Sequence, residues 1–191
     1  MRGAGVRGPV MAIRLVAPPV AMAVSMVDAR AAARANGNDQ DAEIEIRVRA
    51  VTAEAEHFTG QSIINRTYEV TLPGFAEQIA LPSSPLAEVV SLKYLDADGA
   101  TQTLGAGAYV VDLKILPGFV ARAPGTSWPA TKDHPQAVTL TVVCGYGPDE
   151  TTTPPAFKGY IVAKVREFFA PAGTPESPHL IRGLDGEKVH S

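Results

Sequence analysis

The stretch 39–60, DQDAEIEIRVRAVTAEAEHFTG, predicts one long amphipathic helix and decides the fold. Asp39 is a favourable N-cap, and Gly60 can adopt the left-handed conformation that ends a helix. Apolar side chains recur at spacings of four and three, which places them on one face: Ile44, Val48, Val51, Ala55 and Phe58. Such a face needs a packing partner, so we expect further helices beside it.

Two shorter segments carry helix signals of their own. Residues 25–36 open with Ser25 and have Asp28 three positions later, the spacing of a capping box, before an alanine-rich run. Another helix is expected to open at Pro154-Pro155, where a missing backbone N–H costs nothing. Its apolar stripe comprises Phe157, Ile161, Val165 and Phe168. These helices are expected to pack together in a small bundle.

Between the second and the last helix the hydrophobic period changes to two. Residues 65–72 alternate in this way, as in a half-buried strand. Further short strands are predicted at 77–81, 88–95, 101–104, 109–113, 118–122 and 137–145. Because the connections are short, the strands are expected to be mostly antiparallel. The predicted fold class is therefore α+β, a small helical bundle of two N-terminal helices plus one C-terminal helix with an inserted β domain.

The predicted domain organisation follows from these elements. It comprises an extended N-terminal leader (1–24), a helical core (25–60 and 153–170), an inserted β domain (61–152) and a C-terminal tail (171–191). The apolar run of the leader is broken by Arg14 and Pro18-Pro19, so we expect neither a signal peptide nor a membrane span. Either Met1 or Met11 can serve as the natural start.

The composition excludes several classes of function. A net charge of -3 lacks the basic excess of a nucleic-acid binder, and 46% hydrophobic residues are typical of a globular chain. Cys144 is the only cysteine, which rules out an internal disulfide and a multi-cysteine zinc site and favours synthesis in a reducing compartment, the cytoplasm.

The sequence shows no catalytic, cofactor-binding or metal-binding motif. The histidines are scattered without ligand spacing: His57, His134, His179 and His190. Two glycine pairs, at 105–107 and 145–147, lack the remainder of a nucleotide-binding motif. Cys144 is expected to be a small buried hydrophobe, and Trp128 a packing anchor under a loop. We therefore expect no enzyme, no cofactor and no metal.

One alternative class stays open on the β domain, a small enzyme or carbohydrate-binding module. It would need carboxylates that converge near an aromatic ring. The sequence offers Asp96, Asp98, Asp112 and Trp128, but no spacing requires them to meet. Asp96, Asp98 and Gly99 are better explained by a hairpin turn than by a calcium loop, because the closing glutamate is absent.

Two segments suggest interaction surfaces. Ile46, Ala50 and Ala53 lie on another face of the long helix and suit a second packing surface between subunits, although the alanines can equally be helix formers on a solvated face. The tail has a Gly- and Pro-rich composition that does not fold alone. It is expected to become ordered only on a partner, so its removal is expected to leave the rest of the protein folded.

The order of short segments resembles a known family. They are, in chain order, residues 13–19 (IRLVAPP), 24–25 (VS), 58–60 (FTG), 67–72 (TYEVTL), 81–82 (LP), 85–86 (PL), 89–94 (VVSLKY), 96–99 (DADG), 109–112 (YVVD), 127–129 (SWP) and 145–147 (GYG). Together they look like landmarks of the gp8-like head–tail connector family of the phage phiE125 type, related to the HK97-type connectors. The resemblance covers about residues 12–170.

This resemblance implies a structural role in a tailed phage or in a gene transfer agent, a phage-like particle. Proteins of this class form a dodecameric ring below the portal protein, in the neck, and link the filled head to the stopper and tail. DNA would pass through the lumen without specific binding. The tail, through Leu180, Ile181, Arg182 and Leu184, is the predicted portal-binding segment.

Overall fold

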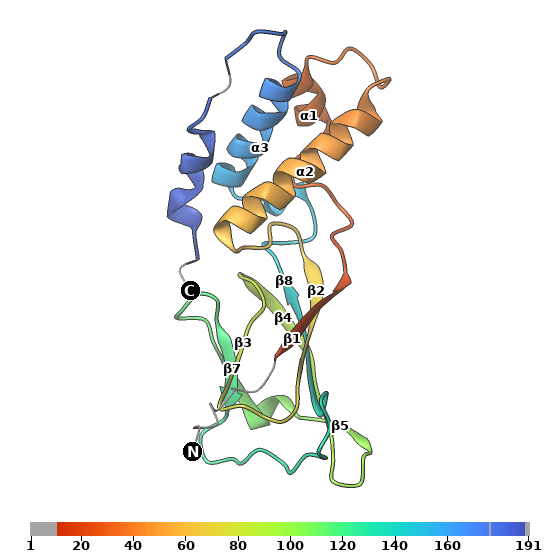
Figure 1. Ribbon diagram of the computed structural model, residues 1–191, viewed down its shortest axis with the longest axis vertical. Coiled ribbons are helices and arrows are strands. Elements are labelled where there is room, and N and C mark those ends of the chain that lie inside the picture. The colour runs from red at the N-terminus through yellow and green to blue at the C-terminus, as the bar shows by residue number, and fades with distance from the viewer. Residues whose placement is uncertain (1–10, 176, 190–191) are drawn as a thin grey trace, which may run out of the picture.

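The computed structural model describes residues 11–175 and 177–189. Figure 1 shows an elongated molecule with its helices at one end and its strands at the other. Residues 1–10 of the expected leader and residues 176, 190 and 191 of the expected tail, including His190, lie outside the described residues.

Three α-helices and three 3-10 helices are described. They are α1 (Met26–Ala33), α2 (Asp41–Thr59), α3 (Pro155–Phe168), η1 (Ala106–Ala108), η2 (Glu150–Thr152) and η3 (Leu180–Glu187). The predicted cap of α1 is confirmed, since the backbone N of Asp28 donates to Ser25 Oγ over 3.1 Å. The helix ends before residue 36, because Arg34 adopts the left-handed conformation with a φ of 57°.

The predicted N-cap of the long helix is wrong. Helix α2 begins at Asp41 with Gln40 in the cap position, and no side chain caps it. The Asp41 carboxylate instead accepts a hydrogen bond from Arg30 Nε of α1 over 2.7 Å, so a contact between helices holds this end. The predicted end is confirmed, with Gly60 at a φ of 73°.

The three α-helices share one apolar core with the segment before α1. Its fully buried members include Val24, Ala29, Ile44, Val48, Ala55, Phe157, Ile161 and Val165. Val51 and Phe58 are partly buried against it, so the predicted stripe of α2 is confirmed. In α3, Phe168 is 45% exposed and its expected burial is wrong. The next residue, Phe169, packs on the core, while the Arg47 guanidinium lies 3.4 Å from the centroid of the Phe168 ring.

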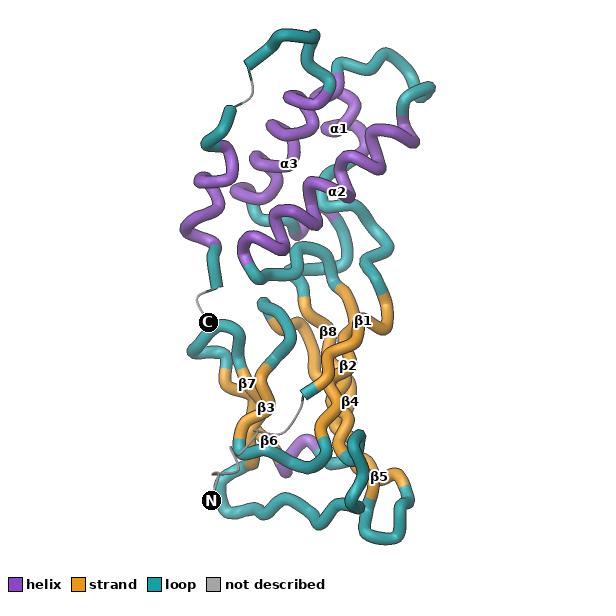
Figure 2. The backbone as a smooth tube through the Cα atoms, in the orientation of Figure 1, coloured by secondary structure: helices purple, strands orange, loops and turns teal. Residues whose placement is uncertain are grey.

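In the described residues, eight strands form two sheets below the helices (Figure 2). They are β1 (Ala12–Ala17), β2 (Arg66–Leu72), β3 (Gln78–Ala80), β4 (Leu86–Leu95), β5 (Thr101–Thr103), β6 (Tyr109–Asp112), β7 (Phe119–Arg122) and β8 (Val138–Cys144). The order is β1-β2-β8-β4-β5 in one sheet and β3-β7-β6 in the other. All of these strand pairs are antiparallel, which confirms the α+β class and the antiparallel pairing.

The two sheets enclose a second apolar core. Residues of β8 point alternately inward and outward, and the inward ones, Val138, Leu140, Val142 and Cys144, are all fully buried. Val120 of β7 and Ile79 of β3 belong to the same cluster, so the small sheet covers the large one. The chain thus has one core among helices and one among strands.

Strand β1 was not anticipated as part of the sheet. It lies in the expected leader and pairs with β2 from Ala12↔Thr71 to Ala17↔Thr67, with a bulge between Leu15 and Ala17. All six of its residues are exposed. Hydrogen bonds to β2, more than burial, therefore hold this strand.

Candidate functional site

The predicted outer face of α2 is free in the single chain. Ile46 is 66% exposed, and Ala50 and Ala53 are exposed as well. A hollow of about 250 Å³ lies between α2 and α3, and Ala50, Glu54 and Phe168 contribute to its lining. The structure thus brings the three predicted residues onto one accessible surface, and their role between subunits stays a prediction.

The C-terminal tail folds back onto the protein's own helices. Helix η3 packs against α2 and α3, with Leu184 fully buried and Leu180 and Ile181 partly buried in the helical core. The expectation of a tail that is ordered only on a partner is therefore wrong for its described residues. The reason is that the three apolar side chains find a surface on α2 and α3, so the tail needs no core of its own.

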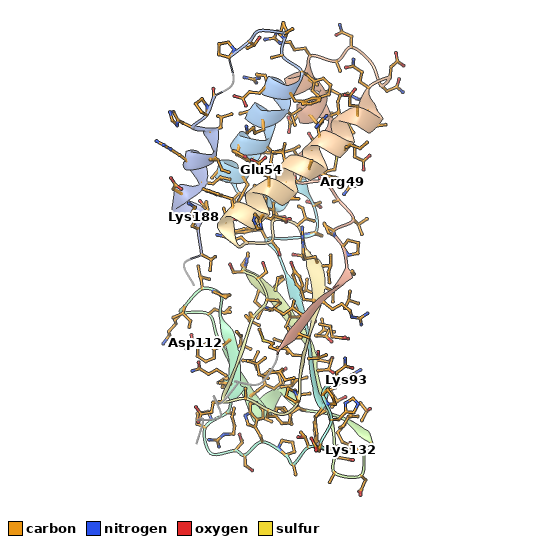
Figure 3. All side chains as sticks on the ribbon, in the orientation of Figure 1. Arg49, Glu54, Lys93, Asp112, Lys132 and Lys188 are labelled. Atoms are coloured by element: carbon orange, nitrogen blue, oxygen red, sulfur yellow. The ribbon has the colours of Figure 1, made fainter. Side chains whose placement is uncertain are left out.

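Polar contacts fasten the end of this tail beside the C-terminal end of α2. The backbone N of Val189 donates to the Thr59 carbonyl over 2.8 Å, and Gln61 Nε2 donates to the Glu187 carbonyl. Lys188 Nζ lies 3.8 Å from the centroid of the Phe58 ring, a cation–π contact. Figure 3 shows Lys188 at the lower end of the tail helix. We call residues 180–189 the strap.

A buried ion pair joins the helical end to the strands. Glu56 near the end of α2 and Arg66 at the start of β2 have side chains only 9% and 16% exposed, with Arg66 Nη2 2.6 Å from Glu56 Oε2. The backbone N of Ile63 in the connecting turn also donates to Glu56 Oε1 over 2.8 Å. Burial raises the pKa of Glu56, while Ile63 and Arg66 oppose that rise. The pair thus ties the last turn of α2 to the first residue of β2.

This pair adjoins a hollow of about 250 Å³ between α2 and the segment that leads from β1 to α1. Pro18, Pro19 and Met22 line one side, and Arg49 lines the other. Because Glu56 and Arg66 neutralise one another, the hollow presents no converging set of unpaired acids and bases. It has the character of a structural joint.

Two free sheet edges expose apolar side chains on the β domain. On β1, Ile13, Leu15 and Val16 are 44–48% exposed. The hairpin that begins at β6 exposes Val110, Val111, Leu113, Ile115 and Leu116, each by 37–57%. Among the described residues, β1 and β5 are the end strands of the large sheet, and β3 and β6 are those of the small one. Sequence reasoning identified neither edge as a candidate surface.

The residues offered for the alternative function lie on separate elements. Asp96 holds the β4–β5 turn by accepting from the backbone N of Ala100 over 2.9 Å, and Gly99 there has a φ of 88°. Asp112 ends β6, where it accepts from the backbone N of Lys114. Trp128 stacks on Phe75 with ring centroids 4.5 Å apart and donates to the Ala76 carbonyl, which confirms its packing role.

Cysteine and metal chemistry find no support in the described part of the chain. Burial raises the pKa of the Cys144 thiol to about 11, which keeps it in the unreactive protonated form near neutral pH. Among residues 11–175 and 177–189, no group of three or more His, Cys, Asp and Glu side chains is placed to hold a metal ion. No helix in this part is long and apolar enough to cross a membrane.

Sequence reasoning missed the joint and the pairing of β1 with β2, although weak signals exist. Val48, Thr52 and Glu56 recur at a spacing of four, which puts Glu56 on the buried side of α2. Residues 12–17, AIRLVA, place an arginine between apolar residues, a short pattern of period two. Neither signal specifies its partner, because both partners are distant in sequence.

Comparison with known proteins gives a match in structure alone. No family model matches the sequence, and no curated protein matches it. The fold is similar to that of a chain in the neck of an empty gene transfer agent (GTA) particle with C6 symmetry, with a TM-score of 0.76 at 17% identity. Two further similar chains come from the virion of a native GTA particle and from a native GTA neck with C12 symmetry. They have TM-scores of 0.74 and 0.68 at 18% identity. Each comparison covers 94% of this chain and 96% of the other, so the fold is shared over nearly the whole chain.

Proposed function

We propose that this protein is a non-catalytic structural component of the neck of a tailed phage or a gene transfer agent. The observation that carries the proposal is the likeness to neck chains over 94% of this chain. It includes the helical core and both sheets, whereas a likeness to the helices alone would fit many small bundles. The order of the short segments that resemble the gp8-like connectors of the phage phiE125 type supports the same role independently.

More specifically, we propose a head–tail adaptor that forms a homo-oligomeric ring, a dodecamer, below the portal protein and links it to the stopper or tail protein. The C6 and C12 symmetries named for the similar neck structures support a ring. The accessible face of Ile46, Ala50 and Ala53 offers one surface between subunits. The protein would be made in the cytoplasm of the bacterial host and reside in the particle neck.

Docking of the strap on the protein's own helices determines which tail residues are accessible to a portal protein. Leu184 is fully buried on the protein's own helices, so it can reach a portal only if the strap leaves them. Arg182 is exposed on the same segment and can contact a portal while the strap stays docked. Leu180, Ile181, Arg182 and Leu184 stay the proposed portal-binding residues, with Arg182 as the one that is accessible from the start.

Passage of DNA through such a ring requires weak contacts with phosphate. Each Lys or Arg that neutralises a phosphate strengthens binding and retards movement. The net charge of -3 suits a lumen that repels DNA weakly. We propose that DNA passes without specific binding, and a lumen lined mainly by arginine in a map of the neck would contradict this.

The experiment that tests the function is deletion of the gene in a host that produces the particles. Filled heads and separate tails should accumulate, and the wild-type gene supplied in trans should restore joined particles. A tagged copy should map to the neck by electron microscopy of purified particles. Normal head–tail joining in the deletion strain, or a tagged copy outside the neck, would overturn the proposal.

A further inference from the structure

Two end strands of the β domain, β1 and β6, match each other in sequence. Strand β1 reads AIRLVA over residues 12–17, and the β6 segment reads YVVDL over 109–113. Each edge has one strand neighbour, β2 and β7 respectively, and among the described residues no strand pairs with its outer side. Exposed apolar edges of this kind promote association unless a partner covers them. The question is which partner fits.

One antiparallel register places opposite charges, and apolar side chains, directly across from each other. Setting Arg14 opposite Asp112 also sets Ile13 opposite Leu113 and Leu15 opposite Val111. The apolar members of these pairs are all among the exposed apolar side chains, 37–49% accessible. Arg14 has 70% of its side chain exposed, so it can keep its 3.0 Å contact with Glu69 and accept a second carboxylate. The same register brings Val16, the residue at the bulge of the β1–β2 pair, opposite Val110.

Shifting this antiparallel register by one residue loses the match. Arg14 then lies opposite either Leu113 or Val111, and Asp112 opposite an apolar residue of β1. Unlike charges directly opposite each other stabilise a strand pair, and apolar pairs add to this. The charge complementarity and the apolar pairs therefore select a single antiparallel register.

We propose that β1 of one copy pairs antiparallel with β6 of a second copy of this chain, so that a sheet runs from one subunit into the next. In Figure 2 the two strands belong to separate sheets of the β domain, β6 in the one drawn on the left and β1 in the one on the right. Figure 3 shows Asp112 on the left flank. The contact is heterologous, because different surfaces of the two copies meet.

Heterologous contacts give closed rings when the rotation between copies closes. This contact therefore deepens the proposed function and rests on it for its biological setting, since it supplies a seam between ring subunits in addition to the α2 face. Isologous pairing of β1 with β1 would instead stop at a dimer. The two arrangements differ in a simple cross-linking experiment.

The test joins the paired positions with cysteines. The double variant Leu15→Cys/Val111→Cys is treated with a short bis-maleimide reagent, both as purified protein at increasing concentration and in purified particles. We expect a ladder of covalent dimers, trimers and higher multimers on a denaturing gel. The wild type controls for Cys144, which is fully buried. Leu15→Cys/Val90→Cys is the matched control, because Val90 is 51% exposed on β4, outside both edges.

Each outcome decides the pairing. A ladder that appears with Leu15→Cys/Val111→Cys and not with the controls supports the pairing. Adding either Arg14→Asp or Asp112→Arg to this double variant should lower the multimer yield several-fold, and adding both should restore it. Dimers from Leu15→Cys alone would establish isologous pairing and overturn the proposal. So would a yield no higher than the Val90 control in both preparations. If particles contain the protein without a ladder, the pairing fails while the neck function stands. If purified protein gives a ladder but the particles do not contain the protein, the pairing stands while the neck function fails.

Discussion

Replacing Leu184 with alanine should destabilise the protein although the residue lies near the C-terminal end of the chain. The Leu184 side chain is fully buried against α2 and α3. The substitution removes three carbon atoms, worth about 0.8 kcal/mol each in transfer free energy, and leaves a cavity that brings the loss to about 3 kcal/mol. For a chain of this size each kcal/mol lowers Tm by about 2–4 °C, so Tm should fall by about 6–12 °C.

The assay is thermal unfolding followed by circular dichroism, together with amide hydrogen exchange. Arg182→Ala is the matched control, because Arg182 lies on the same helix η3 but is exposed, and surface substitutions change stability by about 0.5 kcal/mol or less. If the variant releases only the strap, the loss of stability cannot exceed the free energy with which the strap docks, and the fall in Tm is correspondingly smaller. Exchange then increases at the Val189 amide, which in the wild type donates to Thr59. A variant with the Tm and the exchange of the Arg182 control would refute a docked strap.

Three further predictions concern the joint, acid stability and the lone thiol. Glu56→Ala should lower the free energy of unfolding, measured in urea, by about 3–5 kcal/mol because it leaves Arg66 buried and unpaired. The control Glu45→Ala breaks an exposed pair with Arg49 and should lower it by less than about 1 kcal/mol. Equal losses in the two variants would contradict a buried joint. The hydrogen bond from Arg30 lowers the pKa of Asp41, so the contribution of this carboxylate is present above its ordinary value of 3.8 and is lost as the pH falls through the lowered one. The Tm advantage of wild type over Asp41→Asn should accordingly shrink in acid, and an advantage that grows there would be inconsistent with the assigned pair. Finally, the Cys144 thiol, buried and with a pKa of about 11, should react with Ellman's reagent at pH 8 only after unfolding in urea, and rapid reaction of the folded protein would show that β8 is accessible.

The sequence predicts the parts of the fold that depend on local patterns. The stripe of α2, the proline start of α3 and the strand predicted at 65–72 each follow from the spacing of a few neighbouring residues, and the structure confirms them. The N-terminal boundary of α2 was wrong because Asp41 contacts Arg30, eleven residues away in another helix. A capping preference acts within one turn and is overridden by such a contact between elements.

Among the candidate surfaces, too, only the one that depends on a local pattern could be predicted from the sequence. The outer face of Ile46, Ala50 and Ala53 could be predicted, since periodicity within one helix places all three on one side. The strap could not, because Leu184 becomes a core residue only where α2 and α3 bring a complementary surface to it. Composition led to the prediction that residues 171–191 become ordered only on a partner, and this overlooked a core supplied by the rest of the chain.

The joint between Glu56 and Arg66 connects these findings to assembly. A subunit that transmits contacts from a portal at one end to a tail at the other must hold its two ends at a fixed angle, and an apolar interface alone specifies direction poorly. A buried ion pair adds little net stability, because desolvation offsets its attraction, yet it strongly disfavours every arrangement that separates the charges. Ile63 N–H adds a third contact to the same carboxylate, so the turn between α2 and β2 is held together with the pair. In the proposed ring a subunit would use both the α2 face and the edges of β1 and β6, and this joint relates the helical end to the β domain. A change at Glu56 should therefore disturb contacts between subunits as well as the free energy of unfolding.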